Sequence, residues 1–70
     1  MKAIGAYTLS NNSGIEVYSV NTVEDTVLAS YIRFTDKEDP VECPITYDED
    51  DRYGFDYKGI FVPFEEVMRV

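Results

Sequence analysis

The sequence predicts a mainly β protein: a small antiparallel barrel or sandwich of five to six strands, with one short helical turn close to its C-terminus. Turn signals recur about every ten residues, at 11–14 (NNSG), 23–25 (VED) and 35–40 (TDKEDP), a spacing typical of all-β folds. The runs between them are rich in valine, isoleucine, threonine, tyrosine and phenylalanine, which suit pleated, half-buried positions. Residues 1–70 are expected to form a single domain, because seventy residues leave no room for a second core.

The N-terminal half supplies three of the expected strands. Runs 3–9 (AIGAYTL) and 15–20 (IEVYSV) flank the first turn, and each is partly apolar on both faces, which suits a small barrel or a self-association surface. Run 26–34 (TVLASYIRF) alternates, so it places two sets of side chains on opposite faces: Leu28, Ile32 and Phe34 on one, and Ala29, Tyr31 and Arg33 on the other.

The clearest alternation is in run 41–47 (VECPITY). Val41, Cys43, Ile45 and Tyr47 share one face, and we expect Cys43 to point inward. Pro44 has no N–H group to donate to a neighbouring strand, so this strand is expected at an edge of the sheet or at a bulge.

The next run, 53–57 (YGFDY), places Tyr53, Phe55 and Tyr57 in phase, and we expect all three to face the core. Lys58 and Gly59 then predict a tight turn, because glycine adopts a positive φ at little cost. Residues 60–62 (IFV) would return antiparallel to the preceding strand.

The C-terminal residues predict a single helical turn. Pro63 is expected to open it, because the fixed φ of proline suits the first position of a helix. Phe64, Val67 and Met68 would then form an apolar stripe that closes an open end of the sheet. In architecture alone, such a chain resembles a small SH3-like or OB-like barrel.

Several classes of catalytic chemistry have no residues here. The chain has no histidine and a single cysteine, so it cannot assemble a Ser–His or Cys–His pair, an internal disulfide or a common zinc set. Its four glycines form no phosphate-binding pattern. A carboxylate pair for glycoside hydrolysis needs a cleft that so short a chain has little volume to form. We therefore expect a protein that is not an enzyme and has no cofactor.

The charge balance restricts the partners. Fourteen acidic residues against six basic ones give a net charge of −8, whereas nucleic-acid binding requires lysine and arginine to replace counterions. Direct nucleic-acid binding and binding to anionic membranes are therefore not expected. Without a membrane-length apolar run or a signal-peptide pattern, the expected location is the cytoplasm, or the host cytoplasm if the gene belongs to a phage.

The stretch 47–57 (YDEDDRYGFDY) concentrates this charge. An EF-hand loop that starts at Asp48 would need an acid at Arg52, a glycine at Tyr53 and a glutamate at Gly59, so the register fails. A looser cation site at Asp48, Asp50 and Asp51 is one alternative, and a solvated turn that binds nothing is the other.

Three functions are consistent with these features. The first is a small acidic inhibitor or adaptor that docks on a basic, nucleic-acid-binding protein by charge mimicry, as small acidic phage proteins do. The second is a homo-oligomeric β domain that pairs through run 41–47 or the first hairpin, with its acidity serving solubility. The third is a weak divalent-cation-binding domain. For the first, the expected partner-binding residues are Asp36, Glu38, Asp39, Asp48, Glu49, Asp50, Asp51, Glu65 and Glu66.

Overall fold

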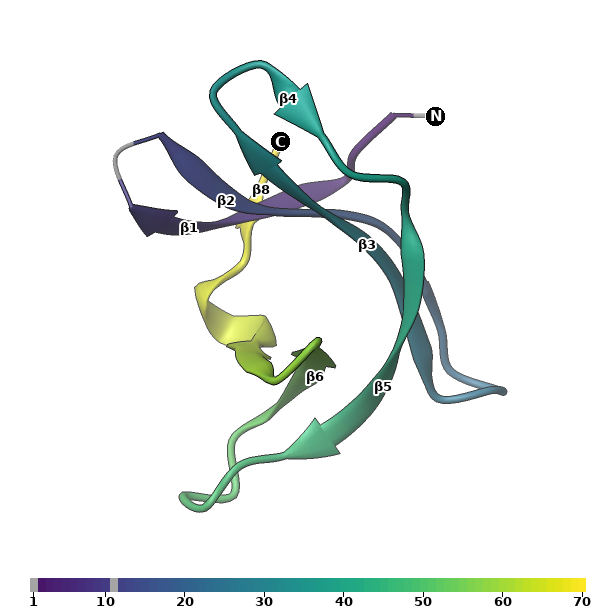
Figure 1. Ribbon diagram of the computed structural model, residues 1–70. Coiled ribbons are helices and arrows are strands. Elements are labelled where there is room, and N and C mark those ends of the chain that lie inside the picture. Colours follow the sequence, from purple (N-terminus) through teal and green to yellow (C-terminus); the bar gives the residue numbers. More distant parts are fainter. Residues whose placement is uncertain (1, 11) are drawn as a thin grey trace.

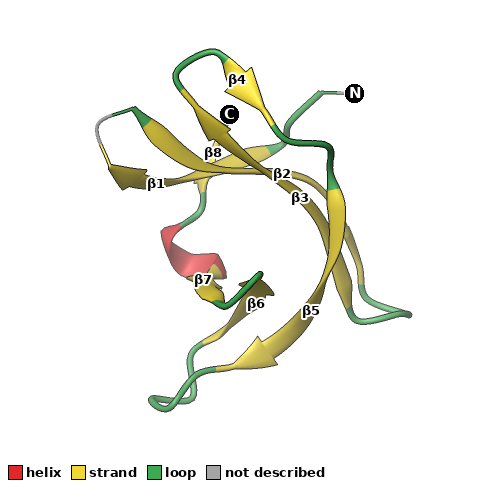
Figure 2. Cartoon of the chain, viewed as in Figure 1, coloured by secondary structure: helices red, strands yellow, loops and turns green. Residues whose placement is uncertain are grey.

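The computed structural model describes residues 2–10 and 12–70, and it confirms a mainly β, antiparallel fold (Figures 1 and 2). All six predicted strands are present, together with two strands of two residues each that the sequence analysis did not predict. The elements are β1 (Gly5–Ser10), β2 (Ser13–Asn21), β3 (Thr26–Arg33), β4 (Asp36–Lys37), β5 (Val41–Tyr47), β6 (Tyr53–Tyr57), β7 (Ile60–Pro63), the 3-10 turn η1 (Phe64–Glu66) and β8 (Met68–Arg69).

The strands form a single curled sheet in the order β7-β6-β5-β3-β2-β1-β8, and β4 pairs separately with β3. The sheet bends into a half-barrel, and η1 lies on its concave side between β7 and β8 (Figure 1). The pairing of β1 with β8 brings residues from the two ends of the described chain together, as Gly5 opposite Arg69 and Ala6 opposite Met68.

The concave face carries the hydrophobic core, as the period of two in a strand dictates. Phe64 and Val67 pack against this core from the C-terminal segment. Cys43 is buried, as predicted. In β3 the inward set is Val27 and Ala29, with Tyr31 packed beside them. The buried members of the core are Ile15, Val17, Val27, Ala29, Cys43, Phe55, Tyr57 and Val62.

The convex face carries a small polar network in place of a second core. Tyr18 is the extra residue of a bulge in β2, and its hydroxyl donates to Glu16 at 2.9 Å. The same hydroxyl oxygen lies 3.0 Å from the buried Ser30 hydroxyl, so Ser30 is satisfied. Lys37 of β4 forms an ion pair with Glu16 at 2.9 Å, and this contact lowers the pKa of Glu16. The network holds β4 against the sheet, although the 35–40 segment that contains β4 was expected to be a turn.

The expectation that β5 lies at an edge or carries a bulge is wrong, because its pairing with each neighbour shows no register shift. This strand lies inside the sheet, where its first half pairs with β3 and its second half, from Ile45, pairs with β6. Ile45 donates its N–H to the carbonyl of Asp25 at 2.9 Å, so the missing N–H of Pro44 is on the side away from β3. Pro44 is tolerated because the pairing with β6 begins only at the next residue.

The C-terminal prediction is partly correct. Pro63 immediately precedes η1, and Phe64 and Val67 contact the core as expected. Met68, however, belongs to β8 and is 71% exposed, because the turn ends at Glu66 and the chain extends again. The tight turn at Lys58 and Gly59 is confirmed, with φ values of 48° and 91°. Positive φ at both positions is the signature of a type I′ hairpin.

The turn predicted at 11–14 is shorter in the structure. Ser13 and Gly14 already belong to β2, and Asn12 is a turn residue. Asn11 lies outside the described residues.

Candidate protein-binding surface

The acidic loop between β5 and β6 is an ordered hairpin connection. Asp48 donates its N–H to the carbonyl of Arg52, and Asp51 donates its N–H to the carbonyl of Asp48, both at 3.1 Å. Asp51 has a φ of 59°. These features define a three-residue hairpin loop, Glu49 to Asp51, in which the last residue is left-handed. Aspartate is one of the few residues apart from glycine that adopts this conformation readily.

Asp48 organises the loop from its first position. Its Oδ1 atom accepts the N–H groups of Asp50 at 2.9 Å and Arg52 at 2.8 Å. Its Oδ2 atom accepts a hydrogen bond from Nε of Arg52 at 2.8 Å. The backbone N–H of Arg52, followed by its side chain, favours the carboxylate form and holds the pKa of Asp48 below its ordinary value. Asp48 therefore acts inside the loop, and its oxygens are already occupied.

Arg52 joins this loop to η1. Its Nη1 atom donates to Glu66 at 3.0 Å, so one guanidinium bridges two acidic residues, Asp48 and Glu66, that are eighteen positions apart. Two of the acidic groups predicted by the sequence, residues 48–51 and 65–66, are thus brought together at one end of the half-barrel.

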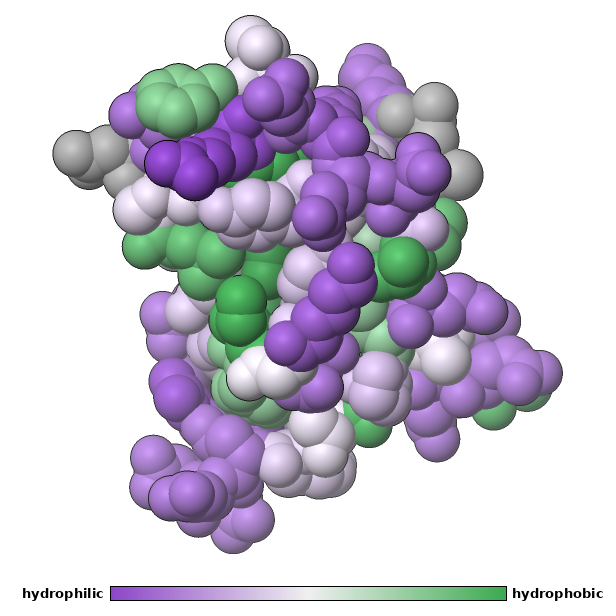
Figure 3. Space-filling view, viewed as in Figure 1, coloured by the Kyte–Doolittle hydropathy of each residue, from purple (hydrophilic) through white to green (hydrophobic). Residues whose placement is uncertain are grey.

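Four acidic residues of this surface are exposed and have no ion pair with any other described residue. They are Glu49, Asp50, Asp51 and Glu65. Hydrophilic side chains cover the loop where it projects from the body of the protein (Figure 3). Because Arg52 is the only basic residue in the 48–52 segment, the loop presents a negative surface to an approaching partner.

Two tyrosines lie at the base of the loop and extend this surface. Tyr47 is 63% exposed and Tyr53 is 46% exposed, and their ring centroids are 5.2 Å apart. The Tyr53 ring also packs on the Phe64 ring, with a centroid distance of 5.1 Å, and this contact holds Tyr53 beside the core. The expectation that Tyr53 faces the core like Phe55 is therefore wrong: it begins β6 at the rim, where the half-barrel is open.

These tyrosines are the site residues that the sequence analysis missed. The available signal was the presence of six tyrosines in seventy residues, since exposed tyrosine is enriched at protein interfaces. We define the acidic–tyrosine surface as Tyr47, Glu49, Asp50, Asp51, Tyr53 and Glu65.

The third predicted acidic group, Asp36 to Asp39, lies at the opposite end of the molecule (Figure 1). The two ends are separated by β5, whose seven residues span roughly 20 Å. This distance exceeds the Debye length of about 8 Å at physiological salt, so the two groups act independently. Glu38 in this group is already in contact with Tyr57, at 2.9 Å, and with Lys58, at 3.5 Å.

No metal-binding set is assembled within residues 2–10 and 12–70: no three aspartate, glutamate, cysteine or histidine side chains converge. Asp48, Asp50 and Asp51, the residues of the alternative cation site, are accordingly not arranged as a ligand set in this structure. In the same part of the chain, no helix is long and apolar enough to cross a membrane.

Comparison with known proteins gives no relative from which a function could be transferred: no family model, curated protein or solved structure matches this chain.

Proposed function

We propose that this protein is a non-enzymatic, acidic protein-binding module, an inhibitor or adaptor that docks on the basic, nucleic-acid-binding surface of a partner protein. The observation that carries the proposal is the combination, at one end of the half-barrel, of four unpaired acids with two exposed tyrosines on a hydrogen-bonded loop. A solvated turn needs neither the internal hydrogen bonds nor the tyrosines.

The two kinds of residue contribute differently to binding. Exposed carboxylates accelerate the encounter with a basic surface and select against acidic partners, but each adds little affinity because water and salt screen it. Tyrosine contributes affinity, because it buries a large apolar ring and its face attracts lysine and arginine cations. A partner whose groove is rich in arginine and lysine would meet both kinds of contact here.

The loop geometry supports mimicry of phosphate charges. Asp48 and Arg52 fix the backbone of the three loop residues, so their carboxylates are displayed from one defined conformation. The loop therefore loses less conformational entropy when it binds a partner than a flexible acidic tail would.

The test is affinity capture from the native host, followed by salt titration of each purified partner. The first variant reverses the charges of Glu49, Asp50 and Glu65 to lysine and keeps Asp48 and Asp51, so that the loop still folds. The second variant makes the same reversal at Asp36, Asp39 and Glu42, which gives an identical net charge. We expect the captured partner to be a basic protein whose binding weakens steeply with salt and is lost only in the first variant.

A third variant, Tyr47→Ala, removes an exposed tyrosine and no charge. We expect it to weaken binding at every salt concentration without changing the salt dependence. Binding that is flat from low to high salt, or that survives reversal of Glu49, Asp50 and Glu65, would contradict the proposal.

A second candidate function is self-association through β8, which forms a free edge of the sheet. Ile4, Met68 and Val70 are 53%, 71% and 75% exposed, and the N–H of Val70 donates to the carbonyl of Ile4. They form an apolar rim beside this edge. Because strand 41–47 lies inside the sheet, the β8 edge takes its place as the element that would pair with a second copy. A dimer mass in sedimentation at tens of micromolar, lost in Met68→Lys, would support it, and a monomer mass would exclude it at that concentration.

A further inference from the structure

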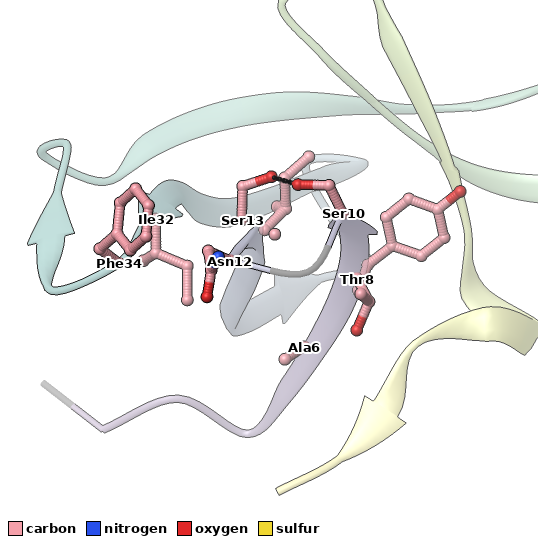
Figure 4. A pocket seen from close by; sticks show the side chains of 10 residues that line it. Ala6, Thr8, Ser10, Asn12, Ser13, Ile32 and Phe34 are labelled. Carbon is pink, nitrogen blue, oxygen red and sulfur yellow. Dashed lines mark hydrogen bonds between the residues drawn. The ribbon is translucent and has the colours of Figure 1, made fainter.

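A groove of about 300 Å³ lies between the β1–β2 hairpin and the β3–β4 hairpin, away from the acidic–tyrosine surface. Phe34 and Ile32 stand at one end, Asn12 and Ser13 in the middle, and Ser10 and Thr8 at the other end (Figure 4). The volume is at the lower limit of the range for small-molecule sites. Its lining residues are Ala6, Tyr7, Thr8, Ser10, Asn12, Ser13, Gly14, Ile15, Ile32 and Phe34.

None of these lining residues is charged. The absence is unusual in a chain in which twenty of seventy residues are charged. A cationic ligand would have no carboxylate in the lining to pair with. An anionic ligand would find a single cation nearby, Arg33 beside Phe34, and would be repelled by the net charge of −8. The groove therefore selects a neutral ligand.

The polar groups of the groove are alcohols and an amide. The hydroxyls of Ser10 and Ser13 lie 2.6 Å apart, so one donates to the other. That contact uses one hydrogen, and the pair still has acceptor sites and a second hydrogen for a ligand. The Thr8 hydroxyl and the Asn12 amide add further groups of both kinds. Such a lining suits a ligand whose own groups both donate and accept, as hydroxyl groups do.

Phe34 supplies an aromatic surface at a conformational cost. It has a φ of 56°, a conformation in which a bulky side chain is a genuine outlier and glycine is the usual residue. Its N–H donates to the carbonyl of Asn12 at 2.7 Å, which locks the β3–β4 turn against the neighbouring hairpin. The residue is nevertheless 66% exposed, with the guanidinium carbon of Arg33 5.8 Å from the ring centroid. A strained residue whose side chain is left in solvent contributes little to the core, and such strain is concentrated at functional sites.

We propose that this groove binds a neutral carbohydrate. A sugar ring presents polarised C–H bonds on one face, which the negative face of an aromatic ring attracts, and hydroxyl groups around its edge. Phe34 would stack on the C–H face of the sugar. The Ser10–Ser13 pair, Thr8 and Asn12 would form hydrogen bonds with its hydroxyl groups. An extended peptide fits less well, because it binds mainly through backbone hydrogen bonds to a free strand edge, and β1 and β2 are paired with each other along this groove.

The test is a screen of the intact protein against an array of neutral and acidic glycans. The best neutral oligosaccharide is then titrated by ¹H–¹⁵N NMR, in parallel with an uncharged tetrapeptide. We expect a neutral sugar to bind with a Kd in the micromolar to millimolar range, with shift changes confined to residues 6–15 and 32–34. The tetrapeptide is expected to cause no shift changes.

Two variants separate binding from folding. Phe34→Gly removes the ring and relieves the backbone strain, so we expect a melting temperature at or above that of the wild type with sugar binding at least about tenfold weaker. Tyr47→Ala removes an equally exposed aromatic ring from the acidic–tyrosine surface and should leave sugar binding unchanged. Absence of any neutral glycan ligand, shifts outside the groove, peptide binding instead of sugar binding, or full binding by Phe34→Gly would each overturn the proposal.

Discussion

Replacing Tyr57 by phenylalanine tests whether the segment after β4 is fastened to the core by a single oxygen atom. The side chain is 2% exposed, and its hydroxyl accepts the N–H of Tyr31 at 3.0 Å and donates to Glu38 at 2.9 Å. The Tyr57→Phe change leaves the Tyr31 N–H without its partner in a half-buried position, which costs about 1–3 kcal/mol. For a domain of this size that is a substantial part of a total stability of roughly 3.5–10 kcal/mol.

The assay is reversible thermal unfolding followed by circular dichroism, with a urea titration to obtain the free energy of unfolding. A loss of about 1–3 kcal/mol corresponds to a fall in melting temperature of at least about 4 °C. Tyr53→Phe is the matched control, because its hydroxyl makes no hydrogen bond to another described residue, and it should change stability by less than about 0.5 kcal/mol.

A third variant identifies which of the two hydrogen bonds matters. Glu38→Ala frees the Tyr57 hydroxyl to bond with water, because Glu38 is half exposed, and should cost less than Tyr57→Phe. If the two changes cost the same, or if Tyr57→Phe is neutral, the reasoning from the Tyr31 N–H is wrong.

Three further predictions concern the acidic loop and the core. Asp51→Gly should stabilise the protein by about 0.5–1 kcal/mol, because glycine suits the φ of 59°, whereas Asp50→Gly, which removes the same charge, should not. The pKa of Asp48 is lowered in the folded state, so its contribution to stability is present above the ordinary value near 3.8 and is lost as the pH falls below it. In Asp48→Asn, the free energy of unfolding from urea titrations should therefore depend less on pH between pH 5 and 2. Burial raises the pKa of the Cys43 thiol, so its reaction with an aromatic disulfide reagent at pH 8 should be slow and should accelerate in Tyr57→Phe.

Much of the fold could be predicted from local patterns. The alternation in run 41–47 placed Cys43 inward correctly, because side chains on a strand must alternate whatever lies beside it. The turn at Lys58 and Gly59 was equally predictable, since a hairpin of that length requires positive φ.

The errors concern relations between distant segments. Whether Pro44 lies at an edge depends on which strand pairs with each half of β5, and no local pattern contains that information. Tyr53 has the same phase as Phe55, but its exposure depends on where the half-barrel ends. The association of the 48–51 and 65–66 acids depends in the same way on Arg52, which contacts both Asp48 and Glu66.

Pro44 also limits the arrangements that β5 can adopt. The ladder with β6 starts at Ile45, opposite Phe55, so the residue before it is Pro44, the one residue of β5 whose backbone cannot donate a hydrogen bond. A slip of two residues that drew Pro44 into the ladder would keep every side chain on its proper face but would leave a β6 carbonyl without a donor. The proline thus discriminates between registers that hydrophobic patterning alone cannot tell apart, and replacing it with valine would be expected to increase conformational heterogeneity before it lowered stability.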